Sequence, residues 1–199
     1  YILTFISAVL AVLCLLFLPE TLPKGKRMSP RLGTLLSNYA SAARHCAFMT
    51  ANTALAVAFL GQGVFIAGAA DWCVEVMRLS PDEFWKLFLP MVSGTVIGSW
   101  ISARIAGRLS TQGTIRVGFC VMFAAGVFAL CTMSGLLPEG IFWAAPPFMI
   151  YTIGIGIVRP GMALIAMDFL PQSRGLAASM QSFVQTIFFA LCSALLVPL

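Results

Sequence analysis

Charge is scarce in this chain. Only 10% of its 199 residues are charged and 60% are hydrophobic, whereas a soluble globular domain has about 25% charged and about 45–50% apolar residues. So few charged side chains cannot cover the surface of a water-soluble globule of this length. We therefore expect most of the chain to lie in lipid, which excludes soluble enzymes, nucleic-acid-binding domains and disulfide-stabilised secreted modules.

Groups that catalyse reactions or bind metals are also few. The chain has one histidine, His45, no HExxH, GxSxG or P-loop motif, and six cysteines without CxxC or other metal-ligand spacing. Most of the cysteines stand inside apolar runs, where cysteine is a small apolar side chain. All seven acidic residues lie in connections or at the ends of apolar runs. We expect no enzyme, no cofactor and no metal ion.

Long apolar runs, by contrast, are abundant. A transmembrane helix needs about 20 mostly apolar residues, and lipid offers no partner to the edge of an open sheet. Six runs have this character and predict six transmembrane helices, at residues 1–18, 47–70, 84–106, 114–134, 141–169 and 176–199. The expected fold class is all-α integral membrane, a polytopic helix bundle.

The charges alternate between the two sides of this bundle. The connections after the first, third and fifth runs hold ten of the 12 Lys and Arg residues, with Glu20 and Asp168 as their only acids. Basic connections stay in the cytoplasm, so we expect residues 24–44 there and both ends of the chain on the outer side. This arrangement fits a fragment that has five helices before Tyr1 and one after Leu199.

Several polar and aromatic side chains stand deep in the predicted helices. Polar groups are costly in lipid and usually face the bundle interior or a watery cavity. They could line an amide-rich and aromatic binding cavity, or each amide could bond to a neighbouring helix. Arg159 could attract an anionic solute or a carboxylate, or extend to the inner interface. The cavity candidates are Asn52, Gln62, Tyr151, Arg159, Gln181, Gln185 and Phe188.

Small residues and prolines mark where helices are expected to pack or bend. Gly94 and Gly98 form a stripe on the third run, and Gly154, Gly156 and Pro160 crowd the fifth. Small residues let backbones approach closely, and proline removes a backbone donor. Bent, glycine-rich helices are often where transporters bind or gate, although close packing alone would also account for these residues.

Four segments, in order and at consistent spacing, carry a family resemblance. They are LPETL at 18–22, LSPDEF at 79–84, GSW through AGR at 98–108, and the stretch from Pro160 to Ser179 that includes RGLAAS. They resemble the later half of a major facilitator superfamily transporter, of the bicyclomycin/chloramphenicol-resistance type of drug:proton antiporter. The six runs are then helices six to eleven of twelve. The inner loop at 107–113 departs from the superfamily signature GxLxDRxGRK, because it lacks the Asp.

The resemblance implies a domain organisation and a function. Residues 1–22 would be the last helix of an N-terminal half, 23–46 a cytoplasmic linker with an interfacial amphipathic helix, and 47–199 a C-terminal half without its final helix. The whole would be a secondary transporter that works by alternating access and exports drug-like or small metabolite molecules, with protons as coupling ion, across the bacterial inner membrane. The alternatives are an uptake carrier for a sugar or organic acid and a non-transporting membrane scaffold.

Overall fold

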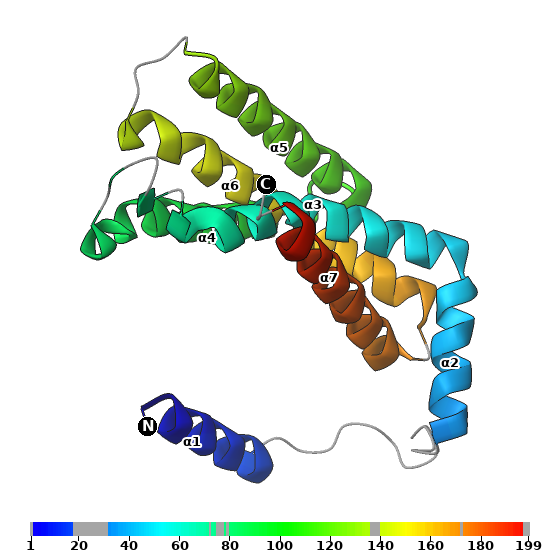
Figure 1. Ribbon diagram of the computed structural model, residues 1–199. Coiled ribbons are helices and arrows are strands. Elements are labelled where there is room, and N and C mark those ends of the chain that lie inside the picture. The colour runs from blue at the N-terminus through cyan, green and yellow to red at the C-terminus, as the bar shows by residue number, and fades with distance from the viewer. Residues whose placement is uncertain are drawn as a thin grey trace. The chain divides into compact units, whose positions relative to one another are not determined.

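The computed structural model describes residues 2–17, 32–71, 73–74, 78, 80–135, 140–171 and 173–196, and these residues are almost entirely helical, with no β-strand among them. The bounds of the helices agree closely with the predicted apolar runs, so the expected all-α bundle is confirmed (Figure 1). The helices are α1 (Ile2–Phe17), α2 (Leu32–Arg44), α3 (Cys46–Asp71), α4 (Trp85–Ile105), α5 (Thr111–Met133), α6 (Ile141–Phe169) and α7 (Arg174–Leu196).

The chain divides into two compact units, Tyr1–Asn38 and Tyr39–Leu199. The first unit contains α1, which is 16 residues long and has no charged residue. The second unit contains the end of α2 and all helices from α3 to α7. All the packing described below lies inside the second unit.

Among the described residues, four helices are long and apolar enough to cross a membrane, as judged by length and composition: α3, α5, α6 and α7. At about 1.5 Å per residue, even the shorter of these exceed the roughly 30 Å of a bilayer's hydrocarbon core. α1 is apolar but shorter. α4 has 21 residues, and Lys86 near its start and Arg104 near its end shorten its apolar stretch. The chain is thus a multi-pass membrane protein.

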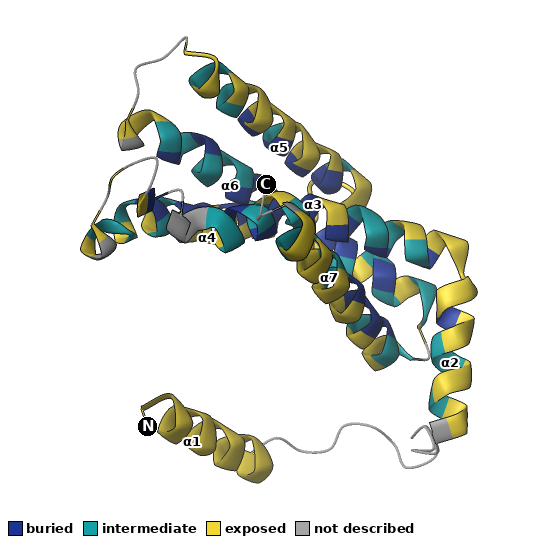
Figure 2. Cartoon of the chain, in the orientation of Figure 1, coloured by how far each residue is buried: buried dark blue, intermediate teal, exposed yellow. Residues whose placement is uncertain are grey.

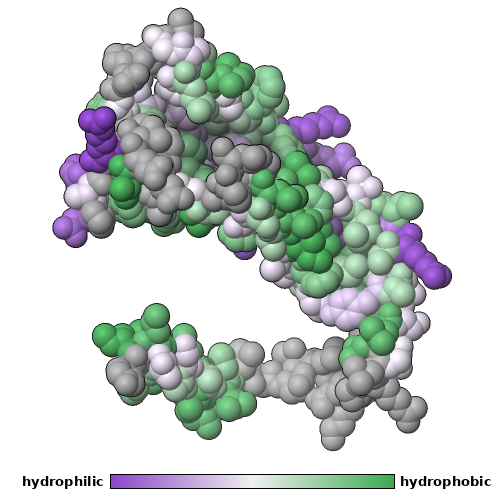
Figure 3. Space-filling view, viewed as in Figure 1, coloured by the Kyte–Doolittle hydropathy of each residue, from purple (hydrophilic) through white to green (hydrophobic). Residues whose placement is uncertain are grey.

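The surface of the second unit is suited to lipid. Large apolar side chains point outward, with exposed fractions of 63% for Val96, 76% for Phe123 and 61% for Phe183. On α5 the buried residues face α6 and the exposed ones face away (Figure 2). Hydrophilic residues gather toward the ends of the helices, and hydrophobic residues cover the surface between them (Figure 3). A contiguous apolar surface of this extent is unusual for a soluble monomer.

α6 is the centre of the second unit. α4 and α5 pack along it, while α3 and α7 contact both α6 and each other. A Cβ on Gly98 of α4 would meet the carbonyl oxygen of Ile153, and one on Gly156 of α6 would lie 2.6 Å from the carbonyl oxygen of Thr95. The backbones of α4 and α6 are therefore in direct contact, which only glycine permits here.

The contact between α5 and α6 is built in the same way. A Cβ on Gly154 would lie 2.8 Å from the carbonyl oxygen of Gly118. Around this contact the main hydrophobic cluster packs, with Leu55 of α3 and Ile155 and Val158 of α6 almost fully buried. Close backbone approach thus fixes the positions of two helices, α4 and α5, against α6.

The ion pairs among the described residues lie at the two ends of the bundle. At the start of α4 the Ser80 amide donates to Glu83 at 3.3 Å, as in a capping box, and Lys86 donates to the same carboxylate. This hydrogen bond from Lys86 holds the pKa of Glu83 below its usual range. At the other end, Asp168 lies 3.8 Å from Arg174, across the turn between α6 and α7.

Candidate functional site

A pocket of about 340 Å³ lies between α3, α6 and α7; we call it the mid-depth pocket. Three of the seven cavity candidates line it, each from a different helix: Gln62 from α3, Arg159 from α6 and Gln185 from α7. Phe59 and Phe189 line it as well. Helices distant in sequence therefore bring two amides, one guanidinium and two aromatic rings to a single cavity.

The pocket takes its name from its depth in the bundle. Phe59 stands near the middle of α3 and Gln185 at the middle of α7. Arg159 stands ten residues before Phe169, the last residue of α6, which corresponds to about 15 Å along the helix. Binding sites of membrane transporters lie near the bilayer midplane, where helices of a bundle converge.

The side chain of Arg159 extends toward α3. Its Cζ atom lies 5.4 Å from the centroid of the Phe59 ring, which is cation–π distance. A side chain directed to the inner interface would instead run along α6. Arg159 forms no ion pair with any residue that the structure describes; the ion pairs there join Glu83 to Lys86 and Asp168 to Arg174. The pocket therefore holds a positive charge that nothing in the described part of the chain neutralises.

The two side-chain amides of the pocket also lack hydrogen-bond partners among the described residues. Neither Gln62 nor Gln185 forms a side-chain hydrogen bond with another described residue. Thr186, which lines the same pocket, donates its hydroxyl hydrogen to the carbonyl oxygen of Ser182 at 2.8 Å. Each amide can both donate and accept, so the pocket offers donors and acceptors to a ligand.

Phe189 and Phe59 were missed by the sequence analysis. A Cβ on Gly63 would lie only 2.7 Å from Cδ2 of Phe189, so the ring occupies the space that a side chain at position 63 would fill. Phe188, which the sequence analysis chose instead, lines neither pocket described here. The available signal was a spacing of four residues from Gln185 to Phe189, which places both side chains on one helix face.

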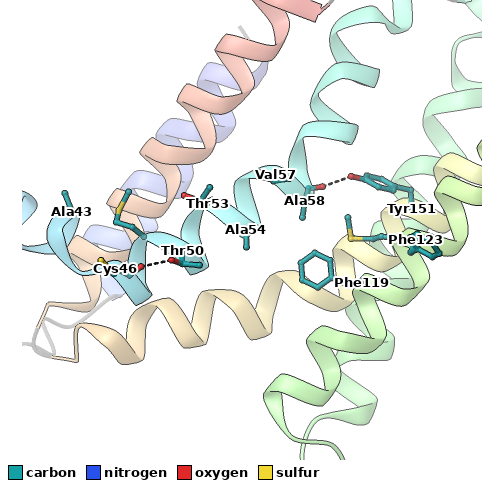
Figure 4. Close-up of a pocket in the computed structure, with 12 residues that line it drawn as sticks. Ala43, Cys46, Thr50, Thr53, Ala54, Val57, Ala58, Phe119, Phe123 and Tyr151 are labelled. Atoms are coloured by element: carbon teal, nitrogen blue, oxygen red, sulfur yellow. Dashed lines mark hydrogen bonds between the residues drawn. The ribbon is translucent and has the colours of Figure 1, made fainter.

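Tyr151 lies in a different pocket, of about 1020 Å³, bordered by α2, α3, α5 and α6 (Figure 4). Its hydroxyl donates to the carbonyl oxygen of Ala58 at 2.7 Å, and the hydroxyl of Thr50 donates to the carbonyl oxygen of Cys46 at 2.9 Å. Internal hydrogen bonds thus satisfy these polar groups, and the remaining walls are largely apolar. A small-molecule site combines apolar walls with a few convergent polar groups, so the smaller pocket is the better candidate despite its size.

Asn52 and Gln181 are buried and line neither pocket. Both amide atoms of Asn52 and the Nε2 atom of Gln181 lack a hydrogen-bond partner in the described part of the chain. Gln181 stands one helical turn before Gln185, toward the end of α7 that packs near Phe48 and Ala177. Their positions make them part of the packing next to the mid-depth pocket.

The glycines and the proline singled out in the sequence lie on α4 and α6. A Cβ on Gly94 would meet the Met149 carbonyl oxygen and the Thr152 hydroxyl, so this residue too borders the contact between the two helices. Pro160 lies inside α6 and directly follows Arg159. The proline is exposed, unlike the glycines.

A bundle of long apolar helices defines the chain as part of an integral membrane protein. The profile of the Major Facilitator Superfamily matches residues 1–193, and the chain belongs to this family. The resemblance found in the sequence is therefore confirmed, and so is the expectation that the chain is not an enzyme.

Similar proteins come from several bacteria. The chain is 21% identical over 196 residues to a bicyclomycin resistance protein homolog of Haemophilus influenzae and 27% identical over 199 residues to an uncharacterized MFS-type transporter, YdgK, of Bacillus subtilis; each match covers 98% of this chain and 48% of the relative. It is 23% identical over 175 residues to the multidrug transporter MdfA of Yersinia pestis, covering 87% of this chain and 42% of the relative. The chain thus spans about half the length of these relatives. No solved structure matches it significantly.

Proposed function

We propose that the intact protein carrying this chain is a secondary active transporter that exports drug-like or small metabolite molecules in exchange for protons. The observation that carries the proposal is the mid-depth pocket, where Gln62, Arg159 and Gln185 converge from three helices without hydrogen-bond or ion-pair partners among the described residues. The names of the relatives, which refer to bicyclomycin resistance and multidrug transport, support a drug-like substrate.

The proposal assigns three segments of this chain to parts of the whole transporter. Residues 1–22 form the last helix of an N-terminal half, residues 23–46 a cytoplasmic linker, and residues 47–199 most of a C-terminal half. The two halves rock about the pocket and expose it to one side of the bacterial inner membrane at a time. The described residues bring no carboxylate to the pocket, so the proton-binding carboxylate belongs to the N-terminal half, which is the partner of this chain in transport.

A proton-gradient assay tests this function. Everted membrane vesicles with the intact protein are energised to an acidic interior, and an acridine dye reports the pH difference. Bicyclomycin, tetraphenylphosphonium and 1-naphthoate are then added separately. An exchanger releases protons when its substrate enters, so at least one compound should dissipate the gradient, and only in vesicles that contain the protein.

Variants connect the flux to the pocket. Gln185→Met removes an amide that lines the pocket and should reduce the response. Phe183→Leu changes an exposed residue on the same helix and should leave it unchanged. A gradient that none of the three compounds disturbs, or equal responses of both variants, contradicts the proposal; absence of any flux would favour a membrane scaffold.

Import of an organic acid is a second candidate. The unpaired guanidinium of Arg159 at the pocket favours it, because an acid would supply the missing negative charge. An importer driven by protons would dissipate the gradient in everted vesicles only when the acid is loaded inside. The side from which the compound acts therefore distinguishes import from export.

A further inference from the structure

We infer that the mid-depth pocket selects small aromatic anions, namely carboxylates or sulfonates attached to one or two fused rings. The inference rests on the proposed function, because it names the substrate class of the same pocket. It is independent of the direction of transport and of the coupling ion. The inference is drawn from three properties of that pocket: its positive charge, its side-chain amides without hydrogen-bond partners among the described residues, and its aromatic walls.

The charge comes from Arg159. The guanidinium is always protonated, and Arg159 is an exposed residue whose charge lies at the wall of the pocket. Its planar fork matches the geometry of a carboxylate, to which it can donate two parallel hydrogen bonds. The carboxylates described near the ends of the bundle are engaged elsewhere or do not line the pocket. An anionic ligand would neutralise Arg159, a neutral ligand would leave it unpaired, and a cation would be repelled.

The amides complete the polar side of the pocket. Gln62 and Gln185 come from two helices other than that of Arg159. Their N–H groups can donate to oxygen atoms of the ligand that the guanidinium does not reach. Three donors from three helices around one cavity favour a group with several acceptor oxygens, such as a carboxylate or sulfonate, over a single hydroxyl.

The aromatic side of the pocket consists of Phe59 and Phe189. The guanidinium already stacks against Phe59 at 5.4 Å, which holds the positive group beside an aromatic surface. Phe189 is 42% exposed, so its face is accessible to a ligand. Flat aromatic ligands gain from offset stacking or edge-to-face contact with such rings.

The volume of the pocket is that of the part of the site formed by α3, α6 and α7. The pocket of about 340 Å³ lies at the lower end of the range of small-molecule sites, about 300–1,000 Å³. One or two fused rings with an acidic group are compatible with this space. Small aromatic acids therefore fit the part of the site that this chain supplies.

Three compounds with the same naphthalene ring and a small substituent of different charge test the selectivity. 1-Naphthoate is an anion, 1-naphthalenemethanol is neutral, and 1-naphthylmethylammonium is a cation. Their affinities are measured by calorimetry on the purified intact protein in detergent at neutral pH, without any gradient. We expect naphthoate to bind about tenfold or more tightly than the alcohol, as a charge-assisted hydrogen bond predicts, and the ammonium compound to bind most weakly.

Variants assign the preference to Arg159. Arg159→Gln should abolish the advantage of naphthoate while binding of the alcohol is retained, which also shows that the pocket is intact. Arg159→Lys should keep a smaller preference, because the ammonium group cannot bind a carboxylate bidentately. Arg116→Gln removes an exposed arginine of α5 that lies outside the pocket and should leave all three affinities unchanged.

Equal binding of the three compounds, or a preference for naphthoate that survives Arg159→Gln, would overturn the inference. If Arg159→Gln binds none of the compounds, the Arg159→Lys variant gives the answer. Tighter binding of naphthoate than of the alcohol in Arg159→Lys supports the inference, and equal binding overturns it. Anion selectivity without any proton-linked flux would reject the transport mechanism alone. Flux of bicyclomycin or tetraphenylphosphonium without anion selectivity would reject the substrate class alone.

Discussion

Two glutamines one turn apart on α7 have different surroundings. Gln181 is buried, and its Nε2 atom has no partner among the described residues, whereas Gln185 opens to the mid-depth pocket. A buried amide without a hydrogen bond costs free energy, while an amide at a pocket keeps its contact with water or ligand. The same residue type therefore destabilises the fold at one position and is available for binding at the next.

Gln181→Met tests this difference. Methionine has nearly the same length and shape as glutamine and is apolar, so the variant should raise the free energy of unfolding by about 1 kcal/mol. The matched variant Gln185→Met should change stability little, because its amide is not buried. Unfolding in detergent micelles with increasing sodium dodecyl sulfate measures both. A loss of stability in Gln181→Met would show that its amide is hydrogen-bonded in the intact protein.

The sequence indicated the kinds of side chain that line the mid-depth pocket, but not which of the chosen residues meet there. Polar residues in apolar helices are recognisable individually, and Gln62, Arg159 and Gln185 were among those chosen. Which of them meet depends on helix rotation and crossing, since periodicity fixes a face of one helix without naming the helix opposite. Tyr151 was placed with them although its hydroxyl bonds to Ala58 in another pocket.

At the scale of the helix, close packing against α6 depends on glycine. Gly98 of α4 lies against the backbone of α6 at Ile153 and Gly156. Gly126 of α5 has open space around its α-carbon. Gly98 lies inside α4 and Gly126 inside α5. Substitutions at these two positions therefore separate the effect of a helix contact on stability from the effect of backbone flexibility.

Adding one methyl group to each tests the contact. Gly98→Ala should lower the free energy of unfolding by about 1–3 kcal/mol, because the helices must move apart. Gly126→Ala should leave stability unchanged or raise it by up to about 1 kcal/mol, as expected from helix propensity. The same detergent titration applies. Equal effects of the two substitutions would mean that α4 and α6 do not touch as described.

At the scale of the whole molecule, the sequence predicted the fold well. Lipid requires long apolar helices, so the runs themselves reveal where helices begin and end, and the structure reproduces their bounds closely. The order of packing around α6 could not be read in this way, because small residues indicate close contacts without naming the partner. Sidedness comes only from the charges, through the preference of basic connections for the cytoplasm.

Thiol labelling tests that sidedness in a variant without the six native cysteines. Asp82→Cys lies at the end of the bundle with the acidic connections, and Gln112→Cys at the end with the basic ones; both positions are exposed. A membrane-impermeant maleimide added to spheroplasts should label Asp82→Cys, and should label Gln112→Cys only after the membrane is permeabilised. Labelling of both positions from the same side would refute the topology.

Pro160 directly follows the residue whose charge defines the pocket. Because proline has no amide hydrogen, the carbonyl group of Gly156, four residues earlier, lacks its usual partner within α6. α6 therefore lacks a backbone hydrogen bond one residue from Arg159, as it also does near its start at Pro146 and Pro147. Because α3, α4, α5 and α7 all pack against α6, bending at Pro160 would move Arg159 relative to the residues of α3 and α7 that line the same pocket.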